Sequence, residues 1–223
     1  MGGVLEGVRV LDFGRYIAGP YCATLLAEFG AEVIRVEKRD GSEDRFVAPV
    51  GEGGEGALFL QVNRNKKCIT LDPMKPEGQE VMRRLVATAD VVVANLPPQT
   101  LRAMKLDYES LKAIKPDIIY VQQSGMGAKG TYGRFRTVGP IANSFSGLSE
   151  MSGLPEPAMP AGWGYSYLDW MGAYSFALAM LSGLYHRART GEGQWVDASQ
   201  AEVGLFISGT TILDWSANGR IWS

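Results

Sequence analysis

The sequence predicts an α/β fold, a Rossmann-like parallel sheet flanked by helices. Short apolar runs typical of buried strands alternate with longer apolar or amphipathic segments typical of helices. Strands that alternate with helices favour a parallel sheet, because each helix carries the chain back to the start of the next strand. The chain has 223 residues, of which 46% are hydrophobic, and this is enough for a sizeable core.

The N-terminal residues predict a strand, a loop, a helix and a second strand. Residues 8–13 form a continuous apolar run, residues 21–29 a helix that Pro20 opens, and residues 31–37 a second strand. This order is a βαβ unit, which pairs two strands in parallel.

A dinucleotide-binding site is a rival interpretation of this unit, because Glu37 ends its second strand. An NAD(P)-binding oxidoreductase would, however, carry G-x-G-x-x-G after the first strand. The loop has only two glycines, and the bulky residues 15–17 stand where a pyrophosphate needs bare backbone. Tyr16 and Ile17 would instead present side chains at the carboxyl end of the strand, where α/β sheets bind ligands.

The alternation continues to residue 122. A charged, glycine-rich surface loop is expected at residues 38–56, where Lys38 and Arg39 would either meet a phosphate or form a solvated charge pair. Further strands are predicted at residues 68–71, 90–95 and 118–122, and further helices at residues 75–87, 101–104 and 108–114.

Residues 124–160 change in character, because glycine, serine, proline and methionine replace the periodic pattern. A long segment without regular structure is uncommon in a compact domain unless it lines a site or crosses between parts. Its glycines permit either close approach of the backbone to a ligand or a flexible connection. A strand-like segment follows at residues 193–199, and an apolar segment at residues 203–212.

A long buried helix is predicted to start at Asp169. The carboxylate stands where an apolar run begins, the run ends in the cations Arg187 and Arg189, and Gly191 follows. These residues are typical of an N-cap, of a helix C-terminus and of a left-handed closing residue. The positive end of a helix stabilises an ionised carboxylate, which is a usable oxygen nucleophile. Asp169 is therefore a helix cap, a nucleophile or both.

The composition argues against several classes of function. A formal net charge of −2 gives no sign of a nucleic-acid footprint. Cys22 and Cys68 lack metal or C-x-x-C spacing, so we expect two buried thiols in a reducing compartment, without a disulfide or a metal site. No signal peptide is visible, and the apolar run at residues 170–185 is too short for a confident membrane span. We expect a cytoplasmic protein that binds neither nucleic acid nor membrane.

Four separated motifs resemble the class III coenzyme A transferases, a superfamily that also contains the α-methylacyl-CoA racemases. They are GVRVLDFGRYIAGPYCATLLAEFGAEVIRVEK, NRNKKCITLD, DVVVANLPP and HRARTGEGQWVDAS, in the family's order. The resemblance implies a CoA-binding α/β large domain over residues 1–200. Residues 201–223 would begin a linker towards a second domain that is absent from this chain. The family also implies ring-like chains that interlock as a homodimer, or as a heteromer with a related subunit.

The resemblance places the catalytic aspartate on Asp169, at the start of the helix before R-x-x-T-G-x-G-Q. It implies transfer of CoA from an acyl-CoA donor to a free carboxylic acid. The reaction would run through a covalent aspartyl anhydride and an aspartyl-CoA thioester. CoA and acyl-CoA would be substrates, with no permanently bound cofactor and no metal.

For CoA, the resemblance implies contacts from Tyr16, Ile17, Lys38, Asn95, Leu96, Arg102, Met104 and Arg136. The first two would lie near the thiol, and Lys38 near the phosphates. Some members carry glutamine where Ile17 stands, which puts in doubt a polar side-chain contact to the reacting carbonyl. Some carry arginine where Ala103 stands, and this leaves Arg102 or Lys105 to meet a phosphate.

Racemase chemistry is the alternative within the superfamily, because moving a proton on and off an α-carbon needs acid/base groups on two faces. The resemblance implies that the racemases use a histidine, in a G-H-D motif, together with the aspartate. The corresponding region here reads VGPIANSFSG, with Gly139 and Pro140 in that place. His186, the one histidine, lies near the C-terminus of the long helix, so transferase chemistry is favoured.

Aromatic residues precede and open the long helix: Trp163, Tyr165, Tyr167 and Trp170. They indicate either core packing or a roomy pocket for a bulky acid, such as a benzylsuccinate-like dicarboxylate. A non-catalytic subunit that completes a heteromer is a third hypothesis, which the presence of Asp169 disfavours.

Overall fold

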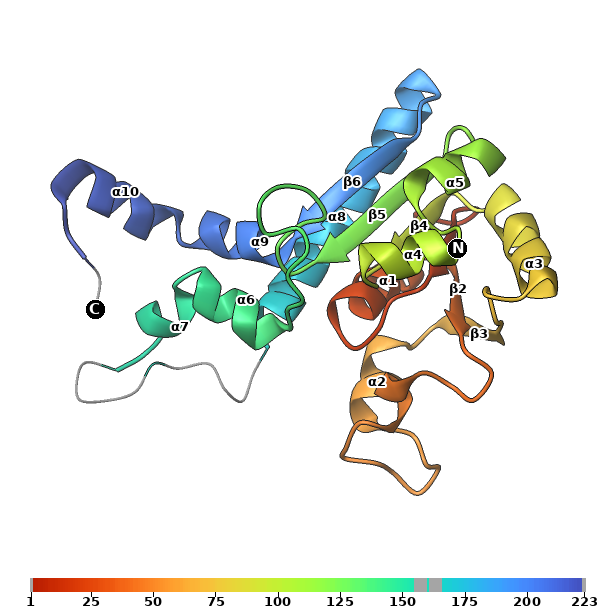
Figure 1. The fold of residues 1–223 in the computed structure, drawn as a ribbon, viewed down its shortest axis with the longest axis horizontal. Helices are drawn as coiled ribbons and strands as arrows, with labels where there is room; N and C mark the ends of the chain where they lie inside the picture. The colour runs from red at the N-terminus through yellow and green to blue at the C-terminus, as the bar shows by residue number, and fades with distance from the viewer. Residues whose placement is uncertain (1, 155–159, 161–165, 222–223) are drawn as a thin grey trace.

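The computed structural model describes residues 2–154, 160 and 166–221, and these form a six-stranded parallel sheet with helices on both faces (Figure 1). The strands are β1 (Arg9–Asp12), β2 (Glu32–Glu37), β3 (Lys66–Thr70), β4 (Val91–Ala94), β5 (Ile119–Ser124) and β6 (Gln194–Ser199). Their order is β3-β2-β1-β4-β5-β6, and every neighbouring pair is parallel. The order reverses between β1 and β4, and sheets of this kind bind ligands at such a reversal.

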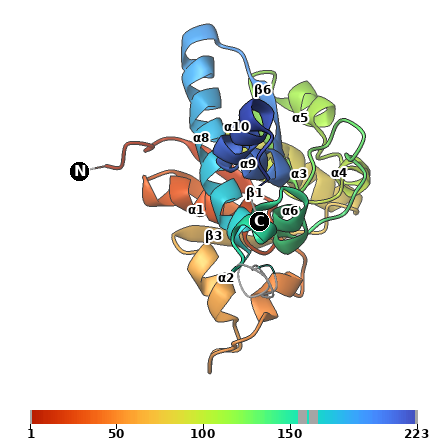
Figure 2. The ribbon, with the colours of Figure 1, turned by 90° about the vertical axis from the view of Figure 1, so that its left-hand side faces the viewer.

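Helices α1 (Ala18–Glu28) and α8 (Tyr167–Thr190) cover one face of the sheet, as Figures 1 and 2 show. The other face carries α3 (Pro76–Ala87), α4 (Pro98–Ala103) and α5 (Tyr108–Ile114). A 3₁₀ turn, η1 (Glu43–Phe46), and α2 (Ala57–Val62) lie between β2 and β3. The remaining helices are α6 (Gly139–Phe145), α7 (Leu148–Met151), α9 (Gln200–Ile207) and α10 (Gly209–Asn218).

Strand β4 shows why the buried strands could be recognised in the sequence. Val91 and Val93 join the apolar cluster beneath α1 and α8, whereas Val92 and Ala94 join the cluster beneath α3, α4 and α5. All four residues are completely buried because both faces of the strand are covered. Burial of each valine stabilises the fold by roughly 1.5 to 3 kcal/mol. The predicted α/β fold with a flanked parallel sheet is confirmed.

A buried ionic cluster ties the carboxyl ends of β1 and β2 to the neighbouring loops. Lys66 Nζ lies 2.7 Å from Asp12 Oδ2, and the Arg35 guanidinium pairs with Asp44 at 2.8 Å. Lys66 also donates to the carbonyl of Pro20 at the start of α1. Burial alone would raise the pKa of Asp12, but Lys66 and Arg35 outweigh burial and hold that pKa below its ordinary value. No local sequence pattern predicts this cluster.

The structure corrects three sequence-based expectations. Helix α1 starts at Ala18, before Pro20, and therefore earlier than predicted. Residues 124–160, expected to lack regular structure, contain the short helices α6 and α7. The thiol expected to be buried at Cys68 is exposed, whereas Cys22 is buried and burial raises its pKa to about 12.

The C-terminal part of the chain is helical. Helices α9 and α10 extend away from the sheet in Figure 1, with α9 packed against α8 and α6. They span residues 200–207 and 209–218, in the region that we predicted as the beginning of a linker at residues 201–223, and the domain boundary there stays a prediction. Within the described ranges, no helix has both the length and the apolar character that crossing a bilayer requires.

Candidate active site

A cleft of about 1210 Å³ opens at the carboxyl ends of β1, β4 and β5. The loops after these strands form one side, and the start of α6 with the first turn of α8 forms the other. Its lining includes residues 15–18, 95–99, 123–125 and 133–140, together with Glu43, Leu58, Arg102, Ala128, Ser166, Asp169 and Gln200. The cleft therefore lies at the strand-order reversal where a ligand was expected.

Asp169 is the third residue of α8, which begins at Tyr167, so the carboxylate is not the N-cap that we predicted. Ser166 takes the N-cap position, and its carbonyl accepts a hydrogen bond from the Asp169 backbone N–H at 3.0 Å. The side chain still lies in the first turn, at the positive end of a 24-residue helix. The predicted left-handed closing residue is Gly191, with φ of 78°.

The carboxylate of Asp169 is held by neutral groups. Gln200 Nε2 donates to Asp169 Oδ1 at 2.5 Å. On the other side, a Cβ built on Gly139 would lie 2.3 Å from Asp169 Oδ2, so only glycine leaves room there. Burial raises the pKa of Asp169 above its ordinary value, and hydrogen bonds from Gln200, Ser166 and Gly139 offset part of that rise. The net direction is a rise in the pKa of Asp169, although the side chain lies in the first turn of α8.

The loop after β1 is fixed from two directions. Asn95 Oδ1 accepts from the Arg15 backbone N–H at 2.7 Å, and Asn95 Nδ2 donates to the Arg15 carbonyl at 2.8 Å. Next along the chain, the Tyr16 N–H donates to Asp44 Oδ2 at 2.9 Å. These bonds hold Tyr16 at φ 61°, in the left-handed region that non-glycine residues rarely occupy. The Tyr16 ring is consequently half exposed at the mouth of the cleft.

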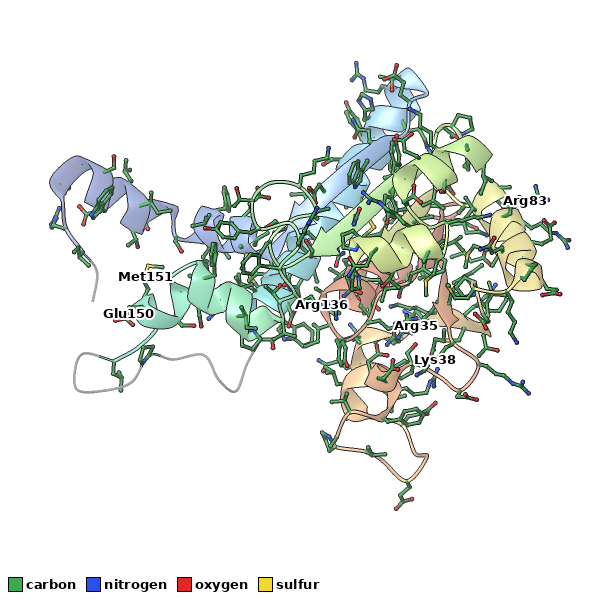
Figure 3. The ribbon with its side chains drawn as sticks, viewed as in Figure 1. Arg35, Lys38, Arg83, Arg136, Glu150 and Met151 are labelled. Carbon is green, nitrogen blue, oxygen red and sulfur yellow. The ribbon has the colours of Figure 1, made fainter. Side chains whose placement is uncertain are left out.

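The cleft is electropositive away from Asp169. Among its lining residues within the described part of the chain are four arginines, at positions 15, 102, 134 and 136. Figure 3 shows Arg136 close to α6 and Lys38 farther along, beyond the end of β2. Guanidinium groups bind phosphates and carboxylates through paired N–H donors. The arrangement can therefore hold a polyanionic ligand while presenting a carboxylate to it.

Most of the site residues that the resemblance implied lie together at this cleft. They are Tyr16, Ile17, Asn95, Leu96, Arg102, Arg136 and Asp169. Lys38 forms an ion pair with Glu43 and is 56% exposed, outside the lining residues. Met104 packs against the apolar cluster beneath α3, α4 and α5. Contacts of Lys38 and Met104 with CoA stay predictions, as do those of the lining residues.

Sequence reasoning missed Gln200 and the part played by Gly139. A glutamine directly after a strand belongs to no sequence motif. Its contact with Asp169 arises only because β6 ends beside the start of α8 in the fold. In the sequence, Gly139 stands out only as the residue in the place of a racemase histidine. Its contact with Asp169 Oδ2 depends on packing between α6 and α8, which no local pattern reveals.

The remaining candidates lie elsewhere. His186 Nε2 is 3.8 Å from Glu192 Oε2 near the C-terminus of α8, as its position predicted, and does not line the cleft. Trp170 packs edge-on against Tyr21 with ring centroids 4.9 Å apart. Trp163 and Tyr165 lie outside the described residues. Within the described ranges, no group of three or more His, Cys, Asp or Glu side chains is placed to hold a metal ion.

Comparison with known proteins bears directly on what this cleft is for. The sequence profile of CoA-transferase family III matches residues 5–223. The chain belongs to CoA-transferase family III. The resemblance stated from the four sequence motifs is thereby confirmed.

Several relatives of this family III chain are named as CoA-transferases. The succinate–glutarate CoA-transferase of Agrobacterium fabrum is 35% identical over 224 residues, which are 97% of this chain and 56% of that protein. The succinyl-CoA–L-malate CoA-transferase alpha subunit of Chloroflexus aurantiacus is 35% identical over 94% of this chain and 48% of its own length. The family III chain thus spans about half the length of the curated relatives it matches.

A solved structure agrees with the architecture. A CAIB/BAIF family protein from Brucella suis superposes with a TM-score of 0.93 at 34% identity, covering 99% of this chain and 59% of that protein. The parallel sheet and its flanking helices are therefore those of a known CoA-transferase family fold.

The contact between Gly139 and Asp169 bears on the racemase alternative for this family III chain. The region in which the racemase resemblance calls for a histidine reads VGPIANSFSG, with Gly139 and Pro140 in that place, and a Cβ on Gly139 would lie 2.3 Å from Asp169 Oδ2. The racemase alternative is accordingly not favoured.

Proposed function

We propose that the protein transfers CoA from an acyl-CoA donor to a free carboxylic acid, with Asp169 as the nucleophile. The observation that carries this proposal is the setting of Asp169, a half-buried carboxylate at the cleft with no ion pair among the described residues. A cation in direct contact would lower the reactivity of the oxygen, whereas neutral hydrogen-bond donors leave it available. Family membership supports the same activity.

The first step is attack of an Asp169 carboxylate oxygen on the thioester carbon of the donor. A carbon–oxygen bond forms, the carbon–sulfur bond breaks, and CoA leaves as a thiolate with the bonding electron pair. The product is a mixed anhydride between the donor acid and Asp169. The arginines lining the cleft would hold the nucleotide phosphates and keep the departed thiolate within reach.

In the second step the thiolate attacks Cγ of Asp169 and expels the donor acid, which leaves a thioester between the enzyme and CoA. The acceptor acid then reverses both steps: its carboxylate attacks Cγ, and the thiolate attacks the acceptor's acyl carbon. One difficult exchange is thus divided into steps of near-equal energy, and the thioester bond is kept. CoA is a substrate throughout, and the proposal requires no permanently bound cofactor.

Short dicarboxylic acids are the substrate class that we infer. Relatives are named for succinate, glutarate and L-malate, each of which carries a second carboxylate. Tyr167 and Trp170, which first indicated a roomy aromatic pocket, are not among the residues lining the cleft. The arginines of the cleft offer partners for a second carboxylate.

Assembly and location belong to the same proposal. We infer an interlocked homodimer, or a heteromer with a related subunit, acting in the cytoplasm. The relative named as an alpha subunit supports the heteromeric form. A non-catalytic role for this chain is disfavoured because Asp169 is present at the cleft.

The test is chemical trapping in the full-length protein. After incubation with succinyl-CoA and hydroxylamine, we expect a hydroxamate on the peptide that contains Asp169, and none in Asp169→Asn. The asparagine variant keeps the side-chain shape, and circular dichroism with thermal unfolding would verify its fold. A protein that exchanges CoA at an unchanged rate after this substitution would contradict the proposal. Deuterium entering the α-carbon without CoA exchange would instead indicate the racemase alternative.

A further inference from the structure

Gln200 lies where it touches an atom of the proposed covalent intermediate. It is the first residue of α9, directly after β6, and is only 6% exposed. Its Nε2 donates to Asp169 Oδ1, and a carboxylate oxygen can only accept, so the amide nitrogen must face it. Gln200 and Asp169 are 31 residues apart in sequence and meet at the wall of the cleft.

The two oxygens of Asp169 have different surroundings. Oδ1 is held by the Gln200 amide, whereas Oδ2 faces the bare backbone of Gly139. Ser166 and Gly139 also form hydrogen bonds with the carboxylate, but the short bond from Gln200 engages Oδ1, so we assign the attack to Oδ2. If Oδ2 attacks the donor thioester, Oδ1 becomes the carbonyl oxygen of the anhydride and remains beside Gln200.

This arrangement has a consequence for the second step. When the thiolate attacks Cγ, the carbon–sulfur bond forms and the carbonyl electron pair moves onto Oδ1. That oxyanion collapses to re-form the carbonyl, breaking the bond from Cγ to Oδ2 and releasing the donor acid together with Oδ2. An N–H donor already aimed at the position where negative charge develops is the arrangement of an oxyanion hole.

We propose that Gln200 is a catalytic residue that stabilises the oxyanion on Asp169 Oδ1 and keeps this oxygen distinct from Oδ2 through the reaction cycle. This inference rests on the proposed aspartyl intermediate and adds a residue to it. A neutral donor suits the role, because a lysine or arginine would form an ion pair with the resting carboxylate and weaken the nucleophile.

The pKa of Asp169 can report on Gln200, because few titratable groups influence it. The helices packed on α8 bring Tyr21, Cys22 and Glu28 from α1 and Glu202 from α9, and none of these side chains is among the causes of the pKa shift of Asp169. Gln200 is the first of the groups that lower this pKa. Removing it should therefore raise the pKa of Asp169 and move the acid limb of the rate profile to higher pH.

The main test is isotopic. Each turnover with a carboxyl-labelled acceptor acid delivers one heavy oxygen to Asp169, in the place of Oδ2. If Gln200 prevents the two oxygens from exchanging places, the Asp169 peptide of the wild type will carry one heavy oxygen after many turnovers, and Gln200→Leu will carry two. Two heavy oxygens in the wild type would overturn the proposal. This refuting measurement is made on the wild type alone and does not depend on whether a variant folds.

Steady-state kinetics supply the second test. Gln200→Leu should lower kcat about 100-fold, as the loss of one oxyanion donor does elsewhere, while the KM for acyl-CoA changes by less than about twofold. Its acid limb should lie at higher pH than that of the wild type. Gln194→Leu, the same change at the start of β6 and away from the cleft, is the matched control and should leave kcat unchanged.

The outcomes separate this inference from the proposed function. Unchanged kcat and an unmoved acid limb in a folded Gln200→Leu variant would refute the role of Gln200, even if Asp169 is trapped by hydroxylamine. Failure to trap Asp169 in the wild type would refute the covalent mechanism itself. If Gln200→Leu does not fold, Gln200→Glu replaces it, and its added negative charge should raise the pKa of Asp169.

Discussion

The side-chain amide of Asn95 forms hydrogen bonds with both backbone polar groups of Arg15, which lies 80 residues earlier in the chain. The amide is therefore engaged by the protein itself. These bonds make Asn95 a clamp on the loop that carries Tyr16 and Ile17, and its direct contact with CoA stays a prediction. Through the clamp, Asn95 can also affect CoA binding by fixing the shape of this loop.

Replacing Asn95 by leucine should loosen the loop. Two hydrogen bonds of about 1 kcal/mol each are lost, and the Arg15 N–H and carbonyl are left without that partner. We expect a drop of about 2 kcal/mol in the free energy of unfolding and a rise of about tenfold in the KM for acyl-CoA. Asn95→Asp keeps the acceptor for the Arg15 N–H, so its free energy of unfolding and its KM should lie between those of the wild type and Asn95→Leu. Equal KM values in all three proteins would show that the clamp is not needed.

Gly139→Ala tests the space beside the proposed nucleophile. The new Cβ would lie 2.3 Å from Asp169 Oδ2, so the carboxylate must move. Because small misplacements of reacting groups cost about 100-fold in rate, we expect kcat to fall by that order. Binding of CoA, measured by calorimetry, should change little. Gly209→Ala is the control, since nothing lies within 4 Å of its Cβ, and it should retain full activity.

Lys66→Met should be strongly destabilising. The Lys66 side chain is completely buried against Asp12, and its loss leaves a buried carboxylate whose remaining ion-pair partner among the described residues is Arg35, at 3.8 Å. Breaking a buried ion pair in this way costs about 3 to 5 kcal/mol, to be measured by urea unfolding. Lys67→Met is the matched control, because Lys67 is 73% exposed and its pair with Glu32 should contribute less than about 1 kcal/mol. Similar losses in the two variants would contradict the account of the cluster.

Acid should destabilise the protein partly through Glu37. Burial raises the pKa of Glu37, but hydrogen bonds from Arg45 and the Ser42 backbone outweigh it and lower the pKa to about 2. Because the folded-state pKa is depressed, the contribution is present above the ordinary value of 4.5 and is lost as pH falls towards about 2. Glu37→Gln should show a shallower fall in the free energy of unfolding over this range. The exposed Glu52→Gln should keep the slope of the wild type.

Much of the fold could be predicted because the strands are buried on both faces. A run such as residues 91–94 is apolar at every position, so composition alone identifies it as a central strand. Helices α6 and α7 could not be predicted in this way. They have only seven and four residues, and their helical form depends on packing against α8 and α9, which local propensity does not report.

The sequence predicted Asp169 at the candidate site but not the buried charges that support it. Asp169 was reached from the start of an apolar run, although the helix begins two residues earlier, at Tyr167. The buried cluster around Arg35 was missed because charged residues in a strand ordinarily indicate a solvent-facing side. Its members come from β1, β2, β3 and η1, and only the parallel pairing of the strands brings them together.

Asp169 and Gln200 lie at the two ends of a segment that leaves the cleft and returns to it. Helix α8 carries the chain away from the cleft, and β6 carries it back. The helix covers about 36 Å over its 24 residues. Where Gln200 arrives is set by the hydrogen-bond ladder between β6 and β5, since Ser124 pairs with Ser199. Extra residues in the turn at 191–193 would therefore leave the two side chains in contact, whereas deleting one residue inside β6 would rotate the amide to the opposite side of the sheet. The distance between Asp169 and Gln200 therefore depends on the register of β6 in the sheet and not on the length of the chain that connects them.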